Sequence, residues 1–464
     1  MRSLRGAALT VVLLFVCALA VPLAQPATWL ETYREPIAHI LRTAQADDFA
    51  WRRLTYLTDT FGSRLSGSSS LAAAIEWAVE EMGADGLENV RKDPVMVPRW
   101  VRGRESLEML LPQPQSLPML GLGMSVGTPP NGIEADLLVV DSFVELERRS
   151  TEAQGKIVLF NVPYRGYGPT VAYRVNGPSQ AAAAGAVAVL IRSVGPEGMR
   201  TPHTGMLIYR DGVPRIPAAA IAVEDAARLA RMAARGQRVR LRLAMEATLH
   251  PDVESANVIA EIRGRERPDE IVVVSGHFDS WDVGAGATDD AGGAIAAWEV
   301  ARLLKSLQLR PRRTIRVVLF TNEENGLRGA IDYRDRYAAT LGQHVLMIES
   351  DAGVFAPVGF GFTGNDIGRS QVTAIASLLA STGATRIAAS GGGADIGPSV
   401  VAGRVPAMSL EVDGSKYFLV HHTAADMVDK IEPADFARCV AALTGMAYVV
   451  ADMPQRLGEA VGTQ

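Results

Sequence analysis

Histidine and acidic residues follow three short apolar runs in the C-terminal half of the chain. The runs are 271–274, 315–320 and 345–348, and the residues that follow them are His277 and Asp279, Glu323 and Glu324, and Glu349 and Asp351. Apolar and β-branched residues make each run typical of a buried strand. Because binding sites in open α/β sheets form at the carboxyl ends of strands, we expect these polar side chains to meet at one sheet edge.

Two further segments supply acidic and histidine side chains. Asp289 and Asp290 lie in the glycine-rich sequence GAGATDDAGG, and His422 lies in HHTAAD near the C-terminus. Several carboxylates that converge without a metal would repel one another strongly. A pair of divalent ions removes this repulsion, and a mixture of imidazole and carboxylate ligands suits zinc. Two ions about 3.5–4 Å apart could share a bridging carboxylate and a bridging water.

Each of these elements has an ordinary interpretation when it stands alone. A His-x-Asp triplet is common, paired acids beside glycines are usually solvated turns, and Asp351 could cap a helix. His421 and His422 could be a surface pair. The order of the elements, and their position after strands, is what favours a metal site.

The motifs resemble one family of enzymes. The sequences SGHFDSW, GATDDAGG, TNEENG, ESDAG and HHTAAD are similar to those of the dinuclear zinc exopeptidases that include bacterial leucyl aminopeptidases and carboxypeptidase Q. Three other segments, TFGSRLSGSSSLAAAIEW, DGLENVRKDPVMVPRWVRGRESL and YFLVHH, look most like the carboxypeptidase Q group. The resemblance therefore covers nearly the whole expected mature chain.

The resemblance implies two zinc ions per chain and a role for each motif residue. The implied metal ligands are His277 and Asp351 for one ion, Glu324 and His422 for the other, and Asp289 as the bridge. His422 is preferred to His421 because it immediately precedes Thr423, as in the family pattern. Glu323 would be the general base, and Asp279 would orient His277, because a ligating imidazole usually has such a partner.

The residue types agree with hydrolysis by a metal-bridged water. Such a water becomes acidic enough to attack near neutral pH, and Glu323 could pass its proton to the leaving amine. No serine or cysteine nucleophile is required. Cys439, the only cysteine expected in the mature chain, lies in an apolar helical stretch and is expected in the core.

The predicted function is therefore hydrolysis of terminal peptide bonds in dipeptides or short peptides. Three alternatives stay open: an aminopeptidase that acts on longer peptides, a catalytically silent binding or receptor protein on the same fold, and a one-zinc enzyme like the glutaminyl cyclases. The complete two-metal ligand set disfavours the last two. The resemblance also implies a homodimer.

Strands and helices that alternate from residue 257 onward predict an α/β fold. With the resemblance, the expected architecture is a zinc-exopeptidase three-layer α/β/α sandwich with a mixed central sheet, plus an inserted protease-associated-type α/β domain. The expected segments are a signal peptide over 1–24, a catalytic domain formed by 25–100 and 249–464, and the inserted domain over 101–248. The inserted segment shows no ligand-like spacing, and we expect no chemistry from it. Within it, a small-residue helix is expected over 181–188.

Length, charge and the N-terminus limit the possible partners and location. A chain of 464 residues predicts two domains, and a net charge of −5 gives no electrostatic reason to expect nucleic acid. Arg2 and Arg5 precede an apolar run that ends near the small-residue sequence Ala18-Leu19-Ala20, a pattern typical of a cleaved export signal. We expect a secreted or periplasmic protein that binds peptide substrate and has no stable membrane association after cleavage. An uncleaved anchor is the alternative.

Overall fold

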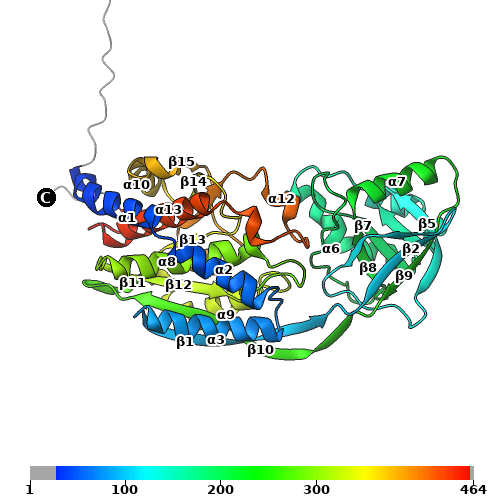
Figure 1. Cartoon of the computed structure of the whole chain (residues 1–464), viewed down its shortest axis with the longest axis horizontal. Coiled ribbons are helices and arrows are strands. Elements are labelled where there is room, and N and C mark those ends of the chain that lie inside the picture. Colours follow the sequence, from blue (N-terminus) through cyan, green and yellow to red (C-terminus); the bar gives the residue numbers. More distant parts are fainter. Residues whose placement is uncertain (1–27, 460–464) are drawn as a thin grey trace, which may run out of the picture.

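The computed structural model of the protein describes residues 28–459, and the predicted signal peptide over 1–24 lies outside this range. The described chain is built around two sheets of eight strands each. Figure 1 shows the two sheets side by side along the long axis of the molecule, with the first and last segments of the chain around the same sheet.

The first sheet is mixed and contains the strands predicted to carry the site. Its order is β1-β10-β12-β11-β13-β16-β14-β15. The bounds are β1 Glu88–Val101, β10 Thr248–Ile262, β11 Arg267–His277, β12 Arg313–Phe320, β13 His344–Glu349, β14 Pro357–Thr363, β15 Arg386–Ala388 and β16 Ala407–Val412. Because β12, β11, β13 and β16 run parallel, their carboxyl ends share one edge of the sheet.

Helices cover both faces of this sheet, which gives the three layers that were predicted. Val272 and Val274 of β11 pack into the core formed with the longer helices, whereas Ile271 and Val273 pack into the opposite core. The first core is formed with α1 Arg34–Ala46, α2 Phe49–Phe61, α3 Ser69–Ala84, α8 Gly292–Ser306, α10 Asp366–Ser377 and α13 Pro433–Asp452. The second is formed with α9 Arg328–Arg336 and α11 Gly397–Gly403.

The second sheet lies between the two long strands β1 and β10 in the sequence. These strands pair antiparallel as far as Val101 and Thr248, where the chain leaves the first sheet and returns to it. The second sheet has the order β3-β2-β9-β5-β6-β7-β8-β4. Its strands are β2 Glu105–Leu111, β3 Gln115–Leu117, β4 Met119–Gly121, β5 Ile133–Val140, β6 Ile157–Phe160, β7 Ala188–Arg192, β8 Ala218–Ile221 and β9 Arg240–Met245.

Helices also flank the second sheet. They are α4 Phe143–Arg148, α5 Ser150–Ala153, α6 Tyr167–Ala183 and α7 Val223–Ala234. The expected helix over 181–188 instead ends at Ala183 and begins fourteen residues earlier than predicted, at Tyr167. The sequence did not indicate the full length of this helix, because the glycine and proline at positions 177 and 178 disfavour a helix interior. The assignment of this region as a protease-associated-type domain stays a prediction.

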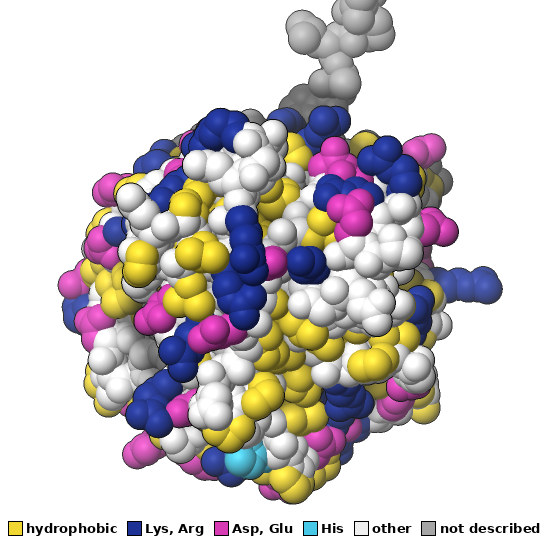
Figure 2. All heavy atoms as spheres, turned by 90° about the vertical axis from the view of Figure 1, so that its right-hand side faces the viewer, with side chains coloured by type: hydrophobic (Ala, Val, Ile, Leu, Met, Phe, Trp, Pro, Cys, Tyr) yellow, Lys and Arg dark blue, Asp and Glu magenta, His cyan; other side chains and the backbone are white. Residues whose placement is uncertain are grey.

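Within residues 28–459, α13 is the one helix long and apolar enough to cross a membrane. Its side chains are mostly buried in the first core. Burial of this kind is what a core helix of a large domain requires. At the other end of the molecule, Figure 2 shows basic, acidic and apolar side chains interspersed over the surface of the second sheet and its helices.

Candidate metal centre

His277 ends β11, and its ring lies between two acidic side chains. Its Nε2 is 3.2 Å from Oδ1 of Asp289 and 3.5 Å from Oδ1 of Asp351. Its Nδ1 lies 2.9 Å from the backbone carbonyl of Asp279, which can only accept a hydrogen bond. Nδ1 therefore carries a proton, and Nε2, which faces Asp289 and Asp351, is the atom available to a metal.

Glu324 and His422 form a second pair next to the first. Nε2 of His422 lies 3.1 Å from Oε2 of Glu324 and 3.3 Å from Oδ2 of Asp289. The ring of His421 stacks on that of His422 with 3.6 Å between centroids, and its Nε2 is 3.5 Å from the same Asp289 oxygen. His422 is thus the histidine that contacts both acids, which agrees with its predicted preference over His421.

Asp289 lies between the two pairs, and hydrogen bonds to the backbone around it hold it in place. It lies in the short π-helical turn η2 Ala287–Ala291, and the Asp426 carboxylate accepts hydrogen bonds from the N–H groups of Thr288 and Asp289. Asp290 is held differently: its carboxylate accepts hydrogen bonds from the N–H groups of His277 and Gly293, and one of its oxygens lies within 4.8 Å of ligand atoms of His277 and Asp351. The two adjacent acids therefore have different surroundings, and only Asp289 faces both histidines.

The donor set fits two metal ions that share Asp289. Asp289 Oδ2 and Asp351 Oδ1 are buried and have no hydrogen-bond partner among residues 28–459. Buried carboxylate oxygens are rarely left without a partner, so an ion is the natural counterpart. Ligand atoms lie within 4.8 Å of one another in three groups: His277, Asp289 and Glu324; Asp289, His421 and His422; and His277, Asp290 and Asp351. Imidazole nitrogens and carboxylate oxygens are ligands that suit zinc.

Burial gives the acidic residues an environment that favours a cation. Burial, with the nearby carboxylate of Asp289, raises the pKa of Glu324 to about 7. Burial and the carboxylate of Asp351 raise the pKa of Glu349 to about 7. Burial also opposes ionisation of Asp289, but its interactions with the surrounding His277, His422 and His421 outweigh this and hold its pKa well below the usual range. The bridging position is therefore the one that stays ionised.

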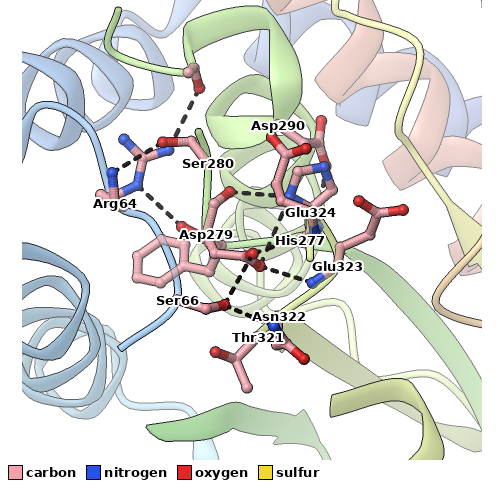
Figure 3. Close-up of polar contacts among 12 residues, drawn as sticks. Arg64, Ser66, His277, Asp279, Ser280, Asp290, Thr321, Asn322, Glu323 and Glu324 are labelled. Atoms are coloured by element: carbon pink, nitrogen blue, oxygen red, sulfur yellow. Dashed lines mark hydrogen bonds and ion pairs between the residues drawn. The ribbon is translucent and has the colours of Figure 1, made fainter. Parts of the chain in front are cut away.

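Glu323 projects toward the same site from the loop after β12 (Figure 3). Burial raises the pKa of Glu323 well above its usual range, and the carboxylates of Asp351 and Glu324 add to this effect. Glu323 lines a cavity of about 380 Å³ together with Asp289, Glu324, Asp351 and His422. Glu323 is thus next to the ligand set, but within residues 28–459 it contributes no atom to the three clusters of side chains that could bind a metal ion.

The structure places Asp279 differently from the prediction. Its carboxylate is 3.9 Å from Nδ1 of His277, and its backbone carbonyl is the hydrogen-bond partner of that ring. The carboxylate instead accepts hydrogen bonds from the backbone N–H groups of Glu323 and Glu324 and from the hydroxyl of Ser66 (Figure 3). A carboxylate that accepts three such bonds can fix the loop that carries both glutamates.

Arg64 is a site residue that sequence reasoning missed. Its guanidinium is fully buried and donates hydrogen bonds to the carbonyls of Gly62, Phe278 and Ala285. Its backbone N–H donates to the hydroxyl of Ser280 (Figure 3). Arg64 thereby holds the loop that follows β11 and leads to Asp289. The only signal in the sequence was its place in TFGSRLSG, one of the segments that carried the family resemblance.

Residues from the region of the second sheet also line the cavity. Tyr167, Arg174 and Met206 contribute to it, although no chemistry was expected from this segment. The ring of Tyr167 stacks on Phe418 with 5.4 Å between centroids, so the two regions meet over the site. Isolated tyrosine and arginine residues on a helix give no spacing signal, which is why the sequence did not indicate them.

Comparisons with known proteins agree with this geometry. A sequence profile of Peptidase family M28 matches residues 257–447. Carboxypeptidase Q of Mus musculus is 47% identical over 408 residues, which are 88% of this chain and 87% of that protein. A Peptidase M28 precursor from Shewanella amazonensis is 34% identical, and its crystal structure has a TM-score of 0.89 over 93% of this chain and 100% of that chain. A zinc aminopeptidase from Bacillus subtilis, 21% identical, shares the fold, with a TM-score of 0.66 over 88% of this chain and 96% of that chain.

Proposed function

The chain belongs to peptidase family M28 and is a zinc metallo-exopeptidase, and we propose that it hydrolyses terminal peptide bonds of dipeptides or short peptides outside the cytoplasm. The observation that carries the proposal is the pair of histidine–carboxylate clusters that share Asp289 on the wall of one cavity. Such a site can polarise a carbonyl and activate water at the same place.

The chain's own residues divide the work of holding the metals. His277 and Asp351 would hold one zinc ion, Glu324 and His422 the other, and Asp289 both. The carbonyl of Asp279 fixes the His277 ring, and the carboxylate of Asp426 fixes the backbone of Asp289. When bound, the two ions supply the Lewis acidity that makes a water acidic near neutral pH and polarises the scissile carbonyl.

Glu323 would move the proton. Its carboxylate lines the cavity without belonging to the ligand set, and its backbone N–H is fixed by Asp279. A carboxylate in this position can accept a proton from the attacking water and deliver it to the leaving amine. Removal of solvent from the cavity strengthens each of these electrostatic interactions.

The size of the cavity supports short substrates. A volume of about 380 Å³ is at the small end of the range for sites that enclose small molecules. Tyr167 and Phe418 stack where the two regions meet and narrow the space beside the site. An aminopeptidase that acts on longer peptides is the alternative within the same chemistry. The longer peptide bound by such an enzyme would have to extend out of the cavity on one side.

The decisive experiment combines metal analysis with a substrate panel. Protein purified without chelator should contain two zinc ions per chain and should cleave dipeptides faster than longer peptides or aminoacyl chromogenic substrates. Preferential cleavage of longer peptides would replace the short-substrate proposal with the aminopeptidase alternative. A zinc content near zero would remove the mechanism and favour a binding or receptor protein.

Location and assembly are part of the same proposal. Intact-mass measurement of the protein from its native cell envelope should show the loss of roughly 20–25 residues, the usual length of a cleaved export signal. A full-length mass would favour a retained anchor. The homodimer is proposed from the family resemblance, and light scattering that shows only monomer at micromolar concentration would contradict it.

A further inference from the structure

Thr204 holds His422 from outside the catalytic sheet. Thr204 lies between β7 and β8, in the region of the second sheet. Its N–H donates a hydrogen bond of 2.9 Å to the carbonyl of His422, and its own carbonyl lies 3.3 Å from Nδ1 of His422. The two residues are thus paired in both directions, through the backbone and through the imidazole.

This pairing determines which ring nitrogen faces the metal site. The Thr204 carbonyl can only accept, and it accepts from Nη1 of Arg174 as well, so a proton on Nδ1 of His422 is the arrangement that satisfies this carbonyl and leaves Nε2 available to a metal. Nε2 is the atom that faces Glu324 and Asp289. A ligating histidine generally has such a partner on its other nitrogen, and that partner fixes the ring and its tautomer. Here the partner, Thr204, lies in the region of the second sheet, whereas the proposed metal ligands lie at the edge of the first sheet.

The backbone of His422 also needs external support. Its φ of 60° lies in the left-handed region, which non-glycine residues adopt only when their surroundings hold them there. The hydrogen bond from the Thr204 N–H to the His422 carbonyl provides one such restraint. The side chain of Thr204 is anchored in turn, because its hydroxyl donates to the carbonyl of Gly121, 2.8 Å away.

Arg174 holds the Thr204 carbonyl from the other side. Its Nη1 is 3.3 Å from this carbonyl and 3.4 Å from Nδ1 of His422, and its Nη2 donates to the hydroxyl of Tyr167. The side chain is buried, and it packs on Gly205 so closely that a Cβ there would lie 2.3 Å from the guanidinium carbon. The guanidinium therefore lies between the backbone of Gly205 and the His422 ring, in a space that only a glycine at position 205 leaves open.

A second contact ties the same region to the loop after His277. Arg102 forms an ion pair with Asp282, and its guanidinium also reaches the hydroxyl of Thr204, 3.4 Å away. Trp281 packs into the core of the second sheet, and a Cβ on Gly123 would lie 2.1 Å from its ring. The segment around Thr204 is thus fixed against both the Asp282 loop and His422.

We propose that Arg174 and Thr204 are positioning residues of the metal centre, which orient His422 and so set the affinity of the zinc ion that His422 and Glu324 bind. The region of the second sheet then contributes to metal binding in addition to lining the cavity. This inference rests on the proposed two-zinc site. It predicts an effect on one ion, because within residues 28–459 neither His277 nor Asp351 forms a hydrogen bond or ion pair with Arg174 or Thr204.

Arg174→Met is the test variant, since a backbone carbonyl cannot be replaced directly. Zinc should be removed with a chelator and its binding measured by competition titration. The dissociation constant of one zinc ion should rise about 10–100-fold, the usual effect of losing a partner of a metal ligand, while the other stays within about twofold. Arg174→Lys, which keeps a charge and a donor, should recover part of the loss.

Two controls separate positioning from general stability. Arg149→Met is matched, because Arg149 also donates to a backbone carbonyl of the second-sheet region, that of Val139, but lines a different cavity. It should leave both zinc affinities unchanged. The metal-free Arg174→Met protein should unfold within about 2 °C of metal-free wild type. In a Glu324→Ala background, where the same zinc site is already lost, Arg174→Met should not weaken the remaining ion.

Each result decides between distinct conclusions. Unchanged zinc affinities in Arg174→Met, or equal weakening of both ions together with a lower unfolding temperature of the metal-free protein, would overturn the positioning role. Weakening of the remaining ion in the Glu324→Ala background would also overturn it. Wild-type protein that binds no zinc would instead contradict the proposed function itself.

Discussion

The side chain of Asp279 holds the backbone of Glu323. Its Oδ1 accepts a hydrogen bond of 3.1 Å from the N–H of Glu323, and its Oδ2 accepts one of 3.3 Å from the N–H of Glu324. One buried carboxylate therefore fixes both the proposed base and a proposed ligand. The same residue holds His277 through its backbone carbonyl. Asp279 therefore links the end of β11 to the loop that follows β12 at the site.

Replacing Asp279 with asparagine should impair turnover without emptying the site. The asparagine amide keeps the size of the side chain but turns a donor toward one of the two N–H groups. We expect kcat to fall about 10–100-fold while zinc stays bound, because the His277 contact is to a backbone carbonyl. Asp225→Asn is the control, since Asp225 is also a buried aspartate but its carboxylate accepts hydrogen bonds from Arg200 in the region of the second sheet. Wild-type turnover in Asp279→Asn would show that the two hydrogen bonds have no role in positioning.

Gly293 illustrates how tightly the loop of Asp289 and Asp290 is packed. A Cβ at this position would lie 1.9 Å from the carbonyl oxygen of Ser350 and 2.3 Å from Oδ1 of Asp290. Gly293→Ala should therefore destabilise the protein by about 1–3 kcal/mol, the usual cost of overpacking, although alanine is the better helix former. Gly342→Ala, where a Cβ would meet nothing within 4 Å, should be neutral or slightly stabilising. Chemical denaturation of both variants measures the difference, and equal stability would refute the packing argument.

The layered fold could be predicted because the strands that carry the site are continuous apolar runs. Residues 315–320 and 345–348 were identified in this way, and they became parts of β12 and β13. The strands β14 and β16 were not predicted. Their sequences, PVGFGFT and AMSLEV, contain glycine or polar residues that obscure the strand pattern, and their strand conformation depends on pairing with each other.

The meeting of the candidate ligands at one sheet edge could be predicted for the same reason, because a strand end fixes where the next side chains lie. His277, Glu324 and Asp351 were accessible to this argument. Arg64, Thr204 and Arg174 were not. They act through backbone carbonyls of segments far away in the sequence, and no residue type or spacing encodes such a contact.

The metal-free protein should lose stability as the pH rises. The pKa of Glu324 and that of Glu349 are raised by burial from 4.5 to about 7. Folded protein therefore holds protons that unfolded protein has released between about pH 4.5 and 7, so the stabilisation is greatest below this window and is lost through it. The unfolding temperature of chelated protein should fall from pH 5 to pH 8.

Zinc should reverse this dependence. A cation replaces the protons as the partner of the carboxylates, and its ligands must be deprotonated, so added zinc should raise the unfolding temperature more at pH 8 than at pH 5. Glu349→Gln, which removes one of the two titrating groups, should flatten the profile of the metal-free protein. Calorimetry at several pH values tests both statements. Metal-free protein that gains stability over this range would be incompatible with the raised pKa values.

Glu323 and Glu324 are adjacent in sequence, yet their substitutions should have different effects. Glu324→Ala removes a ligand, so zinc content and activity should both fall. Glu323→Gln keeps the shape of the side chain and its backbone contact with Asp279, so both zinc ions should stay bound. Turnover should fall by roughly 10²–10⁴-fold, the usual contribution of a general acid–base group, with little change in KM, because the loss lies in the transition state. Near-normal turnover in Glu323→Gln with two zinc ions bound would exclude Glu323 as the base and leave the proton transfer to another carboxylate of the cavity.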